Sequence, residues 1–94
     1  MSAVETEVLE DIKTLTISEL ITTNNLVVHN DDVNTFDWVI QTLVDICKHS
    51  EEQAEQCSLI IHYKGKCSVK SGSFKELEGM KDAILDRGIQ ATIE

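Results

Sequence analysis

The chain has 94 residues with 17 acidic and 8 basic side chains, which gives a formal net charge of −9. This length predicts one domain, and an apolar content of 41% with 27% charged residues is ordinary for a soluble globular protein. The negative charge argues against nucleic-acid binding, which depends on clustered Lys and Arg. It favours a basic partner or a cationic ligand, unless it serves only solubility.

Neither a membrane span nor a secretory signal is predicted. No apolar run approaches the roughly 20 residues that cross a bilayer, and the N-terminal stretch carries acids where a signal peptide has Lys or Arg. The cysteines Cys47, Cys57 and Cys67 are odd in number and form no CxxC pair, which indicates free thiols in a reducing compartment. We therefore expect a cytoplasmic protein without membrane contact.

Residues 1–23 differ from the rest of the chain, because they hold five acids and one base. Their helical pattern around Leu9, Ile12 and Leu15 is weak, so we expect a flexible acidic N-terminal extension. The folded core is predicted over residues 24–94, after a turn at Asn24 and Asn25.

The core is expected to begin with a strand over residues 26–29, followed by a polar run over residues 29–32 with the sequence HNDD. Asn34 is the expected N-cap of a helix that runs to about Lys48, with Asp37 as the acid of a capping box. Trp38 is expected to be half exposed. Helical spacing predicts the buried face of this helix: Phe36, Val39, Ile40, Leu43, Val44 and Cys47.

Ser50 and Gln53 form a second capping box, which predicts a helix to about His62 with Gly65 as its stop. A turn over residues 63–66, a strand over 67–70 and a turn over 71–73, ending in the N-cap Ser73, should follow. The face of the last helix is predicted from apolar spacing as Phe74, Leu77, Met80, Ile84 and Leu85, with the end at Gly88. Residues 89–94 alternate and predict the last strand.

The predicted order is therefore β-α-α-β-α-β, an α+β fold in a single domain. A three-stranded, mainly antiparallel sheet packed against helices is the simplest architecture that buries every apolar stripe.

The cysteines and histidines give little support to catalysis or metal binding. Cys57 and His62 lie about 140° apart around a helix, which separates a thiol from its base. Cys47, His49, Cys57 and Cys67 lack the tight ligand spacing of structural zinc sites, and phosphate-binding glycine loops are absent. No cofactor or metal is expected.

Three further interpretations concern the polar run. Ser58 and His62 share a helix face and, with Asp31, supply the residue types of a hydrolytic triad, although no nucleophile elbow or oxyanion turn is present. The loop after Asp31 lacks the glycine of an EF-hand. Asn30, Asp31 and Asp32 could also do no more than cap the helix and satisfy the loop backbone.

Five segments form a specific combination: VHNDD at residues 28–32, FDWVI at 36–40, SEEQA at 50–54, IHYKGK at 61–66 and ATIE at 91–94. Together they resemble the ClpS family. The resemblance is continuous over about residues 24–66 and looser over the C-terminal third.

The resemblance implies a non-enzymatic adaptor. Such a protein binds substrates with a bulky N-terminal residue (Phe, Tyr, Trp or Leu) and delivers them to a ClpA- or ClpC-type AAA+ unfoldase for degradation. By position, Asn30, Asp31 and His62 would hold the α-amino group of the substrate. The residues that would line the side-chain pocket are Asp32, Asn34, Phe36, Val39, Ser58 and Ile61. The extension 1–23 would engage the unfoldase.

An alternative is a small acidic interaction domain of the same fold, which docks a basic partner without recognising a free N-terminus. The chain also departs from the family pattern. Ser58 stands where most relatives carry a bulky Met, which predicts a wider, more polar pocket and weaker discrimination among large N-terminal residues. Phe36, often Met in relatives, would partly refill that space. Thr35 replaces the usual Pro, and the chain is shorter after Lys66, so unfoldase contacts there are not carried over.

Overall fold

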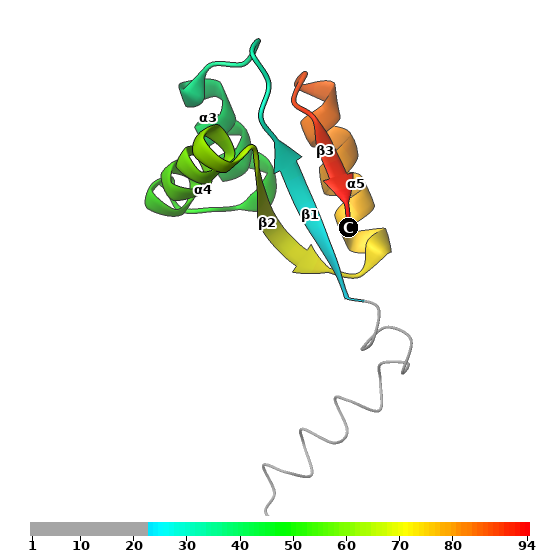
Figure 1. Ribbon diagram of the computed structural model, residues 1–94. Helices are drawn as coiled ribbons and strands as arrows, with labels where there is room; N and C mark the ends of the chain where they lie inside the picture. Colours follow the sequence, from blue (N-terminus) through cyan, green and yellow to red (C-terminus); the bar gives the residue numbers. More distant parts are fainter. Residues whose placement is uncertain (1–22) are drawn as a thin grey trace, which may run out of the picture.

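The computed structural model describes residues 23–94. The elements follow the chain in the order β1 (Asn24–His29), α3 (Phe36–Cys47), α4 (Glu51–Lys64), β2 (Lys66–Gly72), α5 (Phe74–Asp86) and β3 (Ala91–Ile93) (Figure 1). The predicted β-α-α-β-α-β order and α+β class are therefore confirmed. The predicted extension lies outside the described residues except for Thr23, and it stays a prediction.

β1 is the central strand of the sheet, whose order is β2-β1-β3 with antiparallel pairing on both sides. Leu26 and Val28 belong to the main hydrophobic core, whereas Val27 between them does not, because successive side chains point to opposite faces. Leu43, Ile61 and Ile84 bring α3, α4 and α5 into the same core. α4 packs on β2 and α5 on β3 (Figure 1), so both edges of the sheet are supported by helices.

The predicted turn at Asn24 and Asn25 is wrong, because both residues lie in β1. The backbone N–H of Asn25 donates to the Glu94 carbonyl, and its carbonyl accepts from the Glu94 N–H, both at 2.8 Å. Two strand hydrogen bonds thus outweigh the turn preference of asparagine.

The predicted N-cap at Asn34 is also wrong. α3 begins after Thr35, whose extended backbone and hydroxyl, accepting from the Trp38 N–H at 3.1 Å, make it the cap. Threonine is a favourable N-cap, and the Asn34 side chain is used elsewhere. Trp38 is 40% exposed, as expected.

The other helix boundaries follow local signals more closely. Ser50 and Ser73 are the N-caps of α4 and α5, accepting from the backbone N–H groups of Gln53 and Glu76. Gly65 ends α4 with φ +93°, a conformation that favours glycine. The predicted turns over 63–66 and 71–72 are wrong, because α4 continues to Lys64 and β2 spans Lys66–Gly72.

Three predicted core positions are only partly covered. Phe74 is 54% and Leu85 39% exposed, and Phe36 is 38% exposed, whereas Leu77 and Ile84 are fully buried. The helical spacing therefore identified the correct stripe on α5 but overestimated its width. Among the described residues, no helix is both long and apolar enough to cross a membrane.

Candidate functional site

A cavity of about 460 Å³ opens beside the loop that joins β1 to α3. Its lining comes from this loop, from the first turns of α3 and from the C-terminal half of α4. The lining residues are Asn30, Asp31, Asp32, Asn34, Phe36, Val39, Ser58, Ile61 and His62. These nine residues are the nine that the family resemblance singles out, so the structure brings all of them together around one space. The roles assigned to them stay a prediction.

Asp31 organises the loop. Its Oδ1 accepts hydrogen bonds from the backbone N–H groups of Val33 at 2.9 Å and Asn34 at 2.8 Å, which makes an Asx turn. Its Oδ2 accepts from Asn34 Nδ2 at 2.7 Å. The backbone N–H of Asn34 contributes most to lowering the pKa of this carboxyl group below its ordinary value of 3.8, while slight burial opposes it. Asp31 is therefore ionised at neutral pH.

Asp31 thus satisfies the loop backbone, as one of the sequence interpretations held. This does not exhaust its capacity to bind, because a carboxylate has about four acceptor sites. Three hydrogen bonds occupy three of them, so one remains for a ligand. A carboxylate that is already oriented by its own loop is well prepared to receive a cation.

Two long-range hydrogen bonds hold the loop in place. The backbone N–H of Asn30 donates to the carbonyl of Gly65 at 2.8 Å, which ties the start of the loop to the end of α4. Asn34 Nδ2 donates to the carbonyl of Gly88 at 2.8 Å, which ties the end of the loop to the segment before β3. Both amide hydrogens of Asn34 are then used, and its Oδ1 remains as an acceptor.

His62 lies in the last turn of α4, one turn before the glycine that accepts from Asn30. Its ring packs edge-on against Tyr63, with centroids 5.1 Å apart. Within residues 23–94 the ring makes no hydrogen bond, so both nitrogens are available to a ligand.

The cavity combines acidic and apolar surfaces. Asp31 and Asp32 supply negative charge, and no Lys or Arg of residues 23–94 lines the cavity. The side chains of Phe36, Val39 and Ile61 supply apolar surface. An arrangement of this kind suits a ligand that carries a positive charge on an apolar body.

Ser58 is 2% exposed, and its hydroxyl has no hydrogen-bond partner within the part of the chain that the structure describes. The Ser58–His62 hydrogen bond that a serine nucleophile requires is therefore not formed. The same part of the chain contains no group of three or more His, Cys, Asp or Glu side chains that could hold a metal. Burial, followed by the neighbouring Cys67, raises the pKa of Cys57 to about 11, which makes a poor nucleophile.

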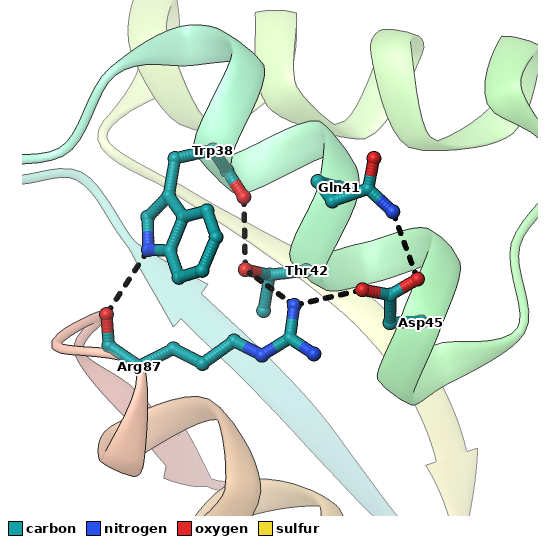
Figure 2. Close-up of polar contacts among 5 residues, drawn as sticks. All are labelled: Trp38, Gln41, Thr42, Asp45 and Arg87. Atoms are coloured by element: carbon teal, nitrogen blue, oxygen red, sulfur yellow. Dashed lines mark hydrogen bonds and ion pairs between the residues drawn. The ribbon is translucent and has the colours of Figure 1, made fainter.

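The sequence analysis missed a cluster that joins α3 to the end of α5 (Figure 2). Trp38 Nε1 donates to the Arg87 carbonyl at 3.0 Å, and the Arg87 guanidinium lies 5.3 Å from the centre of the Trp38 ring. Arg87 Nη1 also pairs with Asp45 Oδ2 at 3.0 Å. Arg87 directly precedes Gly88, whose carbonyl accepts a hydrogen bond from Asn34. The cluster therefore helps to fix the position of the loop that lines the cavity. No local sequence signal could have found it.

Comparison with protein families matches residues 22–92 to the family described as ATP-dependent Clp protease adaptor protein ClpS. The ATP-dependent Clp protease adapter protein ClpS of Streptomyces coelicolor is 32% identical over 68 residues, which cover 72% of this chain and 71% of that protein. The corresponding protein of Streptomyces avermitilis is also 32% identical over 68 residues, covering 65% of its own length.

Two further similarities are more distant or more local. The E3 ubiquitin-protein ligase UBR1 of Drosophila melanogaster is 36% identical over 66 residues, which are 70% of this chain but 4% of that protein. The solved structure of Agrobacterium tumefaciens ClpS2 bound to L-phenylalaninamide superimposes with a TM-score of 0.74 at 19% identity, over 77% of this chain and 94% of that one. At this identity the superposition shows a shared fold.

Proposed function

The chain belongs to the ClpS family of ATP-dependent Clp protease adaptors, and from this premise we propose that it is a non-enzymatic adaptor for N-degrons. It binds proteins whose N-terminal residue is bulky and apolar (Phe, Tyr, Trp or Leu). It then delivers them to a ClpA- or ClpC-type AAA+ unfoldase for degradation.

One observation carries the proposal: the same cavity is lined both by hydrogen-bond acceptors and by apolar side chains. An N-terminal ammonium group offers three N–H donors. Asp31 has one acceptor site left, Asn30 contributes its side-chain amide, and His62 has a free ring nitrogen in its neutral form. Three donors thus meet three acceptors at the rim.

The apolar part of the lining, Phe36, Val39 and Ile61, receives the first side chain of the substrate. The cavity volume of about 460 Å³ lies within the usual range for small-ligand sites. L-phenylalaninamide, the ligand of the similar ClpS2 structure, has a free α-amino group and a phenyl ring. Its chemistry is the chemistry proposed for the ligand of this cavity.

The expected affinity is moderate. Hydrogen bonds to a charged group contribute about 1.5–3 kcal/mol each, and burial of a Phe or Leu side chain adds about 1.5–3 kcal/mol. Association costs at least several kcal/mol, so no more than about 8 kcal/mol remains and binding should be no tighter than roughly micromolar. Such an affinity suits a ligand that must be released.

The decisive experiment compares a fluorescent peptide that begins with a free Phe with the same peptide acetylated at its N-terminus. Acetylation removes the charge and two donors, so binding should be lost. The variant Asp31→Ala should weaken binding of the free peptide at least tenfold. Asp37→Ala is the matched control, because Asp37 is an exposed acid near the cavity that does not line it.

The outcomes separate the competing functions. Equal binding of the acetylated peptide would favour the acidic interaction domain that docks a basic partner, and hydrolysis of the peptide would favour an enzyme. Delivery is tested separately, by the degradation of a reporter with N-terminal Phe by ClpA- and ClpC-containing proteases with and without this protein.

A further inference from the structure

Ser58 is an unusual polar residue for the wall of a cavity that also has apolar side chains. Its side chain is 98% buried, and its hydroxyl has no partner within residues 23–94. More than about nine in ten buried polar groups in proteins are hydrogen-bonded. An unpaired hydroxyl in the lining of a ligand site therefore indicates that the ligand supplies the missing partner.

The surrounding helix does not satisfy this hydroxyl. Buried Ser and Thr side chains in helices often donate to the carbonyl four residues earlier. Thr42 on α3 does so, since its Oγ1 donates to the Trp38 carbonyl at 2.8 Å. Ser58 on α4 makes no such bond to Ala54. The described part of the chain thus contains two buried helical hydroxyls, of which the one in the cavity is unpaired.

The position of Ser58 relative to the amine end of the cavity identifies the part of the ligand that it meets. Ser58 and His62 are four residues apart on α4, so they share a face and lie about 6 Å apart along the helix axis. If the α-amino group lies at His62, Ser58 would face the far end of the first side chain. The ring of that side chain would then lie between them, in the part of the cavity that Phe36, Val39 and Ile61 line.

On the basis of the proposed function, we propose that Ser58 is a specificity-determining residue that hydrogen-bonds the phenol hydroxyl of an N-terminal Tyr. Both hydroxyls can donate and accept, and the Ser58 hydroxyl can turn among its three staggered positions to meet the phenol. Phe and Leu fill the same apolar space but leave Ser58 unpaired. The pocket therefore prefers Tyr to Phe.

The test uses three peptides that differ only in their first residue: Tyr, Phe and 4-methylphenylalanine. The last has nearly the size of Tyr but no hydrogen-bonding group. Fluorescence anisotropy should give about 3- to 10-fold tighter binding for Tyr than for either of the others. In Ser58→Ala the ratio of the Tyr affinity to the Phe affinity should fall to about one. Alanine favours helix, so this variant should fold, which a thermal melt verifies.

Thr42→Val is the matched control, because it removes a buried helical hydroxyl that does not line the cavity. It should keep the preference for Tyr. Equal affinities for Tyr and Phe in the wild type, or a Tyr preference that persists in Ser58→Ala, would overturn the role of Ser58. Equal binding of Tyr and 4-methylphenylalanine would overturn it too, since size alone would then explain the preference. Failure of all three peptides to bind would instead overturn the proposed function, and the role of Ser58 with it.

Discussion

Asn34 and Asp31 form one hydrogen-bonded unit at the rim of the cavity. The backbone N–H of Asn34 donates to Asp31 Oδ1 at 2.8 Å, and its side-chain amide donates to Asp31 Oδ2 at 2.7 Å. The same amide donates to the Gly88 carbonyl at 2.8 Å. Asn34 thereby connects the charged acceptor of the proposed amine site to Gly88, which lies 54 residues after Asn34, before any ligand arrives.

Asn34→Ala should loosen this unit. The loss of two side-chain hydrogen bonds should lower the free energy of unfolding by about 1 kcal/mol and weaken binding of a Phe-initiated peptide about fivefold. The pKa of Asp31 should rise part of the way to its ordinary value, because the backbone N–H bonds remain. Carbon-detected NMR titration of the Asp31 carboxyl measures this shift directly.

Gln41→Ala is the control for Asn34→Ala, because it removes a similar amide–carboxylate bond, Gln41 Nε2 to Asp45 Oδ1 at 2.8 Å, away from the cavity. It should leave peptide affinity and the pKa of Asp31 unchanged. An Asn34→Ala protein that binds like the wild type would show that the loop does not need this unit.

Peptide binding should weaken at high pH. An α-amino group titrates near pH 8, so affinity should fall above that value as the ammonium loses its charge. The lowered pKa of Asp31 keeps its carboxylate charged at all pH values well above 3.8. The loss of affinity above about pH 8 should therefore come from the amine of the ligand and not from Asp31.

The acceptor role of His62 can be tested at a single pH, because His62→Ala removes the acceptor whereas His62→Gln keeps one. At pH 7, His62→Ala should weaken binding of a Phe-initiated peptide about fivefold or more, and His62→Gln should weaken it less. Anisotropy titrations measure both affinities. A His62→Ala protein that binds like the wild type would remove His62 from the acceptor role.

The cluster around Arg87 should stabilise the protein without touching the ligand. Arg87→Ala removes the guanidinium from the Trp38 ring and should lower the free energy of unfolding by about 1 kcal/mol. Arg87→Lys should recover only part of the lost free energy of unfolding, because the ammonium group of lysine lacks the planar shape and paired N–H donors of a guanidinium group. Thermal unfolding checks both variants, with Lys81→Ala as the control, since it removes a cation of α5 whose contact to Asp82 is only a loose 3.9 Å.

The pairing of Arg87 with Asp45 adds a pH dependence of known sign. The hydrogen bond from Arg87, the largest cause, and that from Gln41 hold the pKa of Asp45 below 3.8 in the folded protein. The pair therefore stabilises the fold above pH 3.8, and this stabilisation is lost as the pH falls through the lowered pKa. The stability difference between the wild type and Asp45→Asn should shrink between about pH 4 and pH 2. A difference that is constant with pH would contradict this account.

The sequence could predict those parts of the fold that depend on neighbours along the chain. Ser50, Ser73 and Gly65 act within one helical turn, and each boundary they predicted is present. Asn34 was assigned wrongly because the bond that determines its role reaches Gly88, and the adjacent Thr35 can cap equally well. Asn24 and Asn25 were assigned wrongly for a similar reason, since their strand partners lie far along the chain.

The cavity could not have been found from periodicity alone. Ser58 and Phe36 occupy ordinary helical positions, and nothing in their spacing shows that the two helices converge on one space. The resemblance to a family supplied that information by position. Arg87 lies outside the segments that carry the resemblance, and its partners Trp38 and Asp45 are more than forty residues away, so neither route identified it.

The small side chain of Ser58 should also broaden the range of sizes that the pocket accepts. A serine leaves space that a longer side chain would fill, so peptides beginning with Phe, Trp, Leu and Ile should differ in affinity by less than about tenfold in the wild type. Ser58→Met should narrow the cavity and weaken binding of Trp, the largest of the four, more than that of Leu, because overpacking costs about 1–3 kcal/mol. Val44→Met, a similar enlargement on α3 at a position that does not line the cavity, controls for general strain. If Ser58→Met bound the four peptides in the same ratios as the wild type, the width of the pocket would be set by Phe36 and its neighbours rather than by Ser58.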